Sequence, residues 1–135
     1  FPISRSLYGI PDAPTIPHTV YGSTQTKRLW EFPPSTVRLL RRNLPFSGGG
    51  YLRVLPYPVV RQCIKRVNAR NMPAIMYMHP YELDPDDTAI PNTVARGVSY
   101  HFQRLNRERN PRKIRQLLSE FEFVSIRDAF RDKLG

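Results

Sequence analysis

The chain has 135 residues and a formal net charge of +10 at pH 7. Its length fits one domain or part of one, and no apolar run approaches the roughly 20 residues needed to span a bilayer. A single cysteine, Cys63, excludes an internal disulfide and a cysteine-based zinc cluster, so we expect it to be a small buried hydrophobe. The positive charge favours an anionic partner: a nucleic acid, an acidic polymer or a membrane surface.

The first residues lack the basic, apolar and small-residue regions of a signal peptide. We interpret Phe1 as a cut within a longer protein. Residues 1–28 are rich in proline and carry no apolar period, which predicts an irregular course that ends in a turn at Gly22 and Ser23. Residues 29–135 then alternate strand-like and helical patterns.

The first part of this region combines two short strands with a helix. Alternation predicts a strand at Leu29–Pro33, and a second extended segment could begin at Ser35–Thr36 and continue through Leu40. The glycine run Gly48–Gly50 predicts a turn, a close approach of backbone to another group, or both. Apolar residues at helical spacing predict a helix over Pro58–Val67 with one buried face. The apolar run Ala74–Met78 predicts a strand buried on both faces.

The later part is mostly helical by pattern. A charged helix is expected over about Thr93–Arg107. Asn110 is the predicted N-cap of a second helix with a buried apolar stripe, and a short strand is expected at Phe121–Ser125. Ser125 and Asp128 resemble a capping box that opens a last helix. Helices alternating with apolar strands predict an α/β fold with parallel strands.

His79 lies at the predicted carboxyl end of the Ala74–Met78 strand, where groups point into the ligand crevice of parallel α/β folds. Imidazole can donate a proton near neutral pH, and nearby carboxylates would favour its charged form. The carboxylates that follow it are Glu82, Asp84, Asp86 and Asp87. The alternative is a histidine that satisfies a turn, followed by a solvated acidic loop.

Other sequence patterns narrow the chemistry. The three histidines are far apart, with no HxxxH or HExxH pair, so a catalytic metal would be held by residues outside this chain. No serine lies in a G-x-S-x-G elbow. The glycine run lacks the spacing of a phosphate-binding loop, so it fits a structural turn or a close approach to a ligand, with Tyr51 and Arg53 as polar candidates beside it.

Two basic clusters, Arg38–Arg42 and Arg104–Arg115, could contact phosphates. Neither is interleaved with a stacking aromatic pattern or a known nucleic-acid motif. We therefore expect solvated faces or a docking surface for an anionic polymer, rather than nucleic-acid binding.

Several stretches together carry a family resemblance. "WEFPPST", "FSGGGYLRVLPY", "YMHPYELDPD" and "YHFQRLN…IRQLLSEFEFVSI" resemble, in this order, the C-terminal region of NodB-type polysaccharide deacetylases of exopolysaccharide loci. The resemblance implies the C-terminal portion of a distorted (β/α) barrel. Residues 29–135 would be its C-terminal α/β region, and residues 1–28 a junction with an absent N-terminal half, whose aspartate pair and HxxxH motif bind zinc or a similar divalent metal.

The same resemblance implies a bacterial enzyme that hydrolyses N-acetyl groups of hexosamine units in a polysaccharide. With neither a signal peptide nor a transmembrane segment in these residues, we expect a cytoplasmic location. His79 matches the histidine that protonates the departing amine. Arg53 and Glu82 would bind substrate, or Arg53 a catalytic carboxylate. Three aromatic side chains would line the sugar-binding wall: Trp30, Tyr51 and Tyr81. Relatives commonly read "HPWE", so Tyr81 is a departure that keeps an aromatic ring. The chain alone is expected to be inactive.

Two other functions remain open from sequence. A non-catalytic accessory module would bind glycan on its own and would not need His79. A nucleic-acid-binding domain would bind through its arginine-rich face with strong salt dependence.

Overall fold

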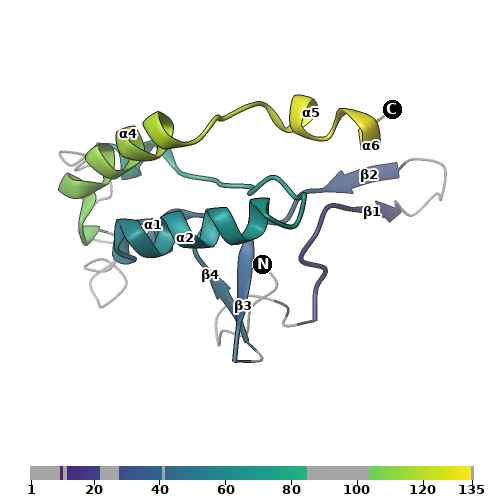
Figure 1. Ribbon diagram of the computed structural model, residues 1–135, viewed down its shortest axis with the longest axis horizontal. Helices are drawn as coiled ribbons and strands as arrows, with labels where there is room; N and C mark the ends of the chain where they lie inside the picture. Colours follow the sequence, from purple (N-terminus) through teal and green to yellow (C-terminus); the bar gives the residue numbers. More distant parts are fainter. Residues whose placement is uncertain (1–9, 11, 22–27, 41, 85–103, 135) are drawn as a thin grey trace, which may run out of the picture.

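The computed structural model describes residue 10 and residues 12–21, 28–40, 42–84 and 104–134. Its strands are β1 (His18–Tyr21), β2 (Arg28–Glu31), β3 (Thr36–Leu39) and β4 (Arg42–Pro45). Its helices are α1 (Gly49–Val54), α2 (Tyr57–Asn68), η1 (Pro80–Glu82), η2 (Arg107–Arg109), α4 (Asn110–Glu120), α5 (Ile126–Ala129) and α6 (Arg131–Leu134). Figure 1 shows α1 and α2 below α4, with the β1–β2 hairpin at the opposite end from α1.

The strands form two antiparallel pairs. In the first, His18 lies opposite Glu31, and in the second Thr36 lies opposite Pro45. The strands predicted within residues 29–33 and 35–40 are confirmed as β2 and β3. The irregular course predicted for residues 1–28 is wrong for β1, because a partner strand later in the chain supplies its hydrogen bonds. The turn predicted at residues 22–23 lies outside the described residues.

The core lies between α2, α4 and the β3–β4 hairpin. The helix predicted over residues 58–67 is confirmed as α2, with Pro58 in its first turn, where its missing N–H costs no hydrogen bond. Cys63 is buried on that helix as predicted, and burial raises the pKa of its thiol. The buried apolar cluster comprises Val37, Phe46, Leu52, Val60, Cys63, Ile64, Val67, Ile114 and Leu117.

The segment Ala74–Met78 is not the doubly buried ladder strand that its apolar run predicted. Within the described residues it makes one parallel bridge, between Gly48 and Tyr77. Ile75 additionally exchanges hydrogen bonds with Ser35. The parallel strands predicted from the sequence are thus represented by this single bridge, and the described fold is mixed α/β with two small antiparallel sheets.

The C-terminal part differs from the predicted order in two places. Asn110 is the first residue of α4 rather than its N-cap, which is Arg109. Residues 121–125 form no strand with any described residue. The last helix begins as predicted, because the Ser125 hydroxyl accepts the backbone N–H of Asp128 at 3.1 Å. Of the helix predicted over residues 93–107, residues 93–103 lie outside the described part.

Among the described residues there is no helix with both the length and the apolar character needed to cross a bilayer.

Candidate functional site

A buried ion pair links α1 to the segment that carries His79. Arg53 Nη1 donates to Glu82 Oε1 at 2.8 Å, and the two side chains are 2% and 1% exposed. A charge pair this well buried is stable only when its geometry satisfies both partners, because desolvation of each charge is costly. Arg53 and Glu82 are 29 residues apart in sequence, so the pair fixes two distant segments against each other.

Glu82 also closes the turn that follows His79. Its second carboxylate oxygen, Oε2, accepts the backbone N–H of His79 at 3.3 Å, and its own backbone N–H donates to the His79 carbonyl at 3.0 Å. Pro80 occupies the first position of η1, where a proline is favourable. The carbonyl of Glu82 accepts Nδ2 of Asn110 at 3.0 Å. Both ends of the turn are therefore tied to buried polar groups.

The imidazole of His79 lies among aromatic rings. It stacks on Tyr81, with ring centroids 5.1 Å apart and planes 8° from parallel, and it meets the Tyr77 ring edge-on at 5.6 Å. The guanidinium of Arg107 lies 5.0 Å from the centroid of the Tyr81 ring, a cation–π distance. His79 itself is exposed. The result is a solvent-accessible imidazole on a fixed aromatic support.

Two glycines allow Tyr77 to reach this position. A Cβ atom at Gly48 would overlap the Tyr77 ring, and Gly49 has φ +50, which favours glycine. The backbone N–H of Tyr77 donates to the Ser47 carbonyl at 3.0 Å. The predicted close approach of backbone to another group is confirmed, and that group is a tyrosine of the same chain.

Gly48→Ala is therefore expected to displace the Tyr77 ring and to weaken the parallel backbone bridge between residues 48 and 77. The overlap cannot be relieved by a small adjustment, so we expect a loss of about 1–3 kcal/mol, typical of overpacking. Hydrogen exchange of the Tyr77 amide measures the effect. In a Tyr77→Ala background the same glycine substitution should cost much less, and an equal cost in both backgrounds would contradict the steric explanation.

Side-chain nitrogen donors of Lys113 and Asn106 hold the carboxyl end of α1. Lys113 Nζ donates to the carbonyls of Leu52 and Leu55 at 2.6 and 2.7 Å, and Asn106 Nδ2 donates to the carbonyl of Arg53 at 3.3 Å. These bonds satisfy carbonyls that a helix end leaves without intrahelical partners. Burial lowers the pKa of the Lys113 ammonium.

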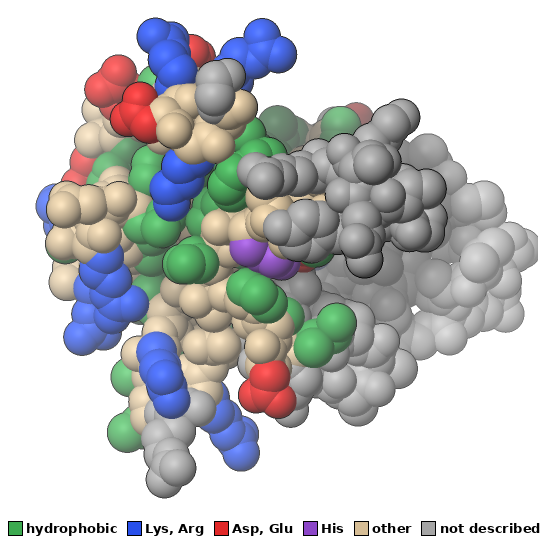
Figure 2. Space-filling view, turned by 90° about the vertical axis from the view of Figure 1, so that its right-hand side faces the viewer, with side chains coloured by type: hydrophobic (Ala, Val, Ile, Leu, Met, Phe, Trp, Pro, Cys, Tyr) green, Lys and Arg blue, Asp and Glu red, His purple; other side chains and the backbone are tan. Residues whose placement is uncertain are grey.

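The predicted solvated character of the Arg104–Arg115 cluster is thus wrong for two of its members. Arg107 is 3% exposed and Lys113 is partly buried against α1. Figure 2 shows Lys and Arg side chains scattered around the described part of one face, with hydrophobic side chains between them. On that face the basic residues do not gather into a single patch.

The structure brings four of the predicted site residues together: His79, Tyr81, Glu82 and Arg53. Tyr51 is half-buried on α1, two residues before Arg53.

Trp30 belongs to β2, at the far end of the molecule from α1 and the start of α4 (Figure 1). Its ring lies 6.1 Å from that of Phe32, which in turn lies 5.2 Å from Phe130. Of the carboxylates expected to act on His79, Glu82 is paired with Arg53 and Asp84 is exposed. Residues 86 and 87 lie outside the described residues.

Sequence reasoning missed three contributors to this site. Asn110 was assigned to a helix cap, Arg107 to a solvated face and Tyr77 to a buried strand. No local pattern distinguishes these roles, since each depends on a contact with a distant segment. The histidine–proline pair and the glycine run were the usable signals.

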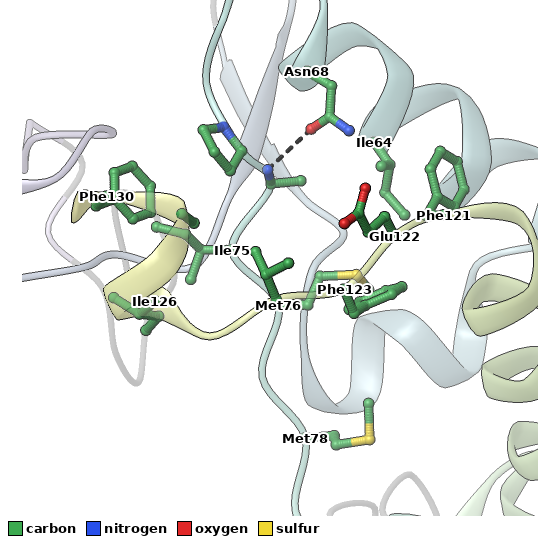
Figure 3. A pocket seen from close by; sticks show the side chains of 14 residues that line it. Ile64, Asn68, Ile75, Met76, Met78, Phe121, Glu122, Phe123, Ile126 and Phe130 are labelled. Atoms are coloured by element: carbon green, nitrogen blue, oxygen red, sulfur yellow. Dashed lines mark hydrogen bonds between the residues drawn. The ribbon is translucent and has the colours of Figure 1, made fainter. Parts of the chain in front are cut away.

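A groove of about 240 Å³ lies on another part of the molecule. Figure 3 shows it between Ile64 and Asn68 of α2, the Ile75–Met78 segment, and the C-terminal stretch that carries Phe121 and Phe130. The Asn68 carboxamide oxygen accepts the backbone N–H of Ala74 at 3.0 Å. The groove is mainly apolar and does not include His79.

The described residues offer no ready metal site, because nowhere among them do three His, Cys, Asp or Glu side chains come together as ligands. The side chains around His79 are an arginine, two tyrosines and a carboxylate already bound to that arginine. This set does not fit a divalent metal, so the predicted metal stays a prediction about residues outside this chain.

Comparison with known proteins gave one family match. The profile of a family described as a domain of unknown function, DUF3473, covers residues 1–131. No curated protein and no solved structure matches the chain. Because the profile spans nearly the whole sequence, including every described site residue, the chain belongs to the DUF3473 family.

Proposed function

We propose that this chain is the C-terminal part of a metal-dependent polysaccharide deacetylase that hydrolyses N-acetyl groups of hexosamine units, with His79 as the general acid. The observation that carries the proposal is the exposed imidazole stacked on Tyr81 above the buried Arg53–Glu82 pair. The resemblance of "YMHPYELDPD" to the late histidine motif of NodB-type deacetylases supports the same assignment.

Hydrolysis of an acetamide expels an amine, which leaves readily only when it is protonated. A positioned imidazole can supply that proton, and general acid catalysis of this kind contributes about 10²–10⁴-fold in rate. The hydrolytic metal would be held by residues outside these 135. Tyr81 would present its ring beside the reacting sugar, and the net charge of +10 suits an anionic polysaccharide.

The hydrogen bonding of the Ile75–Met78 segment supports a chain that is completed by another part of the same enzyme. Ile75 and Tyr77 bond toward Ser35, Ser47 and Gly49. The backbone groups of Met76 and Met78 make no hydrogen bond with any described residue. Backbone groups that pair with no described residue can accept a further strand, which we propose comes from the N-terminal half.

The test is His79→Ala in the full-length protein, assayed by acetate release from an N-acetylhexosamine oligosaccharide. We expect turnover to fall by about 10²–10⁴-fold, with unchanged metal content. His18→Ala is the matched control, because His18 lies on β1 and its ring hydrogen-bonds the Ile16 carbonyl. Turnover of the His79 variant within a few-fold of wild type would refute the general-acid assignment.

A glycan-binding accessory module is the second candidate, favoured by the two tyrosine rings beside His79, the exposed Tyr77 and the half-buried Tyr81. It requires that the protein bind the polysaccharide equally well with alanine at position 79, and that no acetate be released by the full-length protein. Measuring the polysaccharide affinity of the His79→Ala and His18→Ala variants distinguishes the accessory module from the deacetylase.

A further inference from the structure

We infer that Glu82, held by Arg53 and braced by Asn110, is a positioning residue that fixes the main chain of His79 and so the orientation of its imidazole. Its catalytic consequence rests on the proposed function. Glu82 and Arg53 then act through His79, instead of contacting the substrate as the family resemblance implied.

The burial of the two charges supports this role. Glu82 is 1% exposed as a residue and Arg53 is 3% exposed, so neither side chain presents a surface to a polymer in the described structure. Each carboxylate oxygen of Glu82 has its own donor: Nη1 of Arg53 on Oε1 and the His79 backbone N–H on Oε2. The carboxylate therefore couples a buried cation directly to the backbone of the exposed histidine.

Asn110, the first residue of α4, braces the other end of the turn with a hydrogen bond. Asn110 is 1% exposed and donates to the carbonyl of Glu82 at 3.0 Å. The turn is thus held at its first residue by the Glu82 carboxylate and at its last by Asn110. Stacking of His79 on Tyr81 then follows from the backbone, since both residues belong to the same short turn. Catalytic groups need support of this kind because small misplacements reduce rates strongly.

Glu82→Gln tests the link with little change of volume. The two donors lie on different oxygens of Glu82, and a glutamine keeps an acceptor oxygen at only one of these two positions. The charge-assisted bond to Arg53 is the stronger of the two, so we expect the amide oxygen to face Arg53. The amide nitrogen then faces the His79 backbone N–H, and no hydrogen bond forms between them because both groups are donors. The variant removes the restraint on His79 while keeping a partner for the arginine.

A second variant tests the same link independently, in case Glu82→Gln does not fold. Asn110→Leu removes the brace with an apolar side chain of the same branching and a higher helix propensity, which suits a buried position at the start of α4. Glu120→Gln is the matched control, since Glu120 also binds an arginine, Arg61, but lies at the other end of α4 and is half-exposed.

The measurement is NMR of the full-length protein labelled at histidine, with the His79 signals assigned by their loss in His79→Asn. Ring protons of a stacked imidazole are shifted by the neighbouring aromatic ring. We expect both Glu82→Gln and Asn110→Leu to move the His79 ring signals toward those of a free histidine, and Glu120→Gln to leave them unchanged. In the acetate-release assay Glu82→Gln should lower kcat by about 10- to 100-fold, with KM nearly constant.

The outcomes separate the two proposals. Unchanged His79 signals in Glu82→Gln and Asn110→Leu would overturn the positioning role, whatever the activity. Shifted signals with undiminished turnover would support the positioning role and refute catalysis by His79. Equal shifts of the His79 ring signals in the Glu120→Gln control would also overturn the positioning role, because the effect would then not be specific to Glu82.

Discussion

Replacing Arg53 by methionine is expected to lower the free energy of unfolding by about 3–5 kcal/mol, the cost of breaking a buried ion pair by removal of one partner. The methionine fills similar space but leaves the Glu82 carboxylate, 1% exposed, without its cation. Hydrogen exchange in the full-length protein measures the loss in peptides from α1 and from residues 77–84.

The double substitution Arg53→Met with Glu82→Leu is the control. Replacing both members of a buried pair by apolar side chains is often nearly neutral, so the double variant should regain much of the lost stability. If the double variant were as unstable as the sum of two independent losses, the charge pair would not be the source of the effect.

Phe46→Ala is expected to destabilise the fold by about 3–5 kcal/mol, through the lost burial of the ring and the cavity left behind. Phe46 is 0% exposed and directly precedes Ser47, whose carbonyl accepts the Tyr77 N–H. The cavity would therefore open in the apolar cluster, next to the residue that bonds Tyr77. Urea denaturation followed by exchange of core amides gives the change in stability.

Phe123→Ala is the matched control for this substitution. Phe123 is 46% exposed, so truncating it should cost far less. Equal losses at the two positions would mean that the described core is not the one that stabilises the protein.

Local sequence predicted those elements whose stability is local. The helical apolar period gave α2 and much of α4, and the pair Ser125 and Asp128 gave the start of α5. Helix α1 was not predicted, because it begins within the glycine run and glycine is a poor helix former. Lys113 and Asn106 satisfy the carbonyls at the end of that helix from more than fifty residues away, a contribution that no local pattern contains.

Strands were harder for the same reason. An apolar run such as residues 74–78 fits a buried strand or a segment bonded on one edge, and only its neighbours decide between these. At the candidate site, His79 and Arg53 could be selected by residue type and by the turn signals beside them. Their link through Glu82, and the part that Asn110 plays in it, depends on burial and on the meeting of three separate segments.

The β1–β2 hairpin has a practical consequence for dissecting the protein. Residues 18–21 pair with residues 28–31, so a truncated version starting at residue 29 would expose β2 as a lone strand beside the aromatic contacts that join Phe32 to Phe130. Limited proteolysis of folded protein should leave these two strands associated even after a cut between them. An expression boundary placed before residue 18 keeps the hairpin whole.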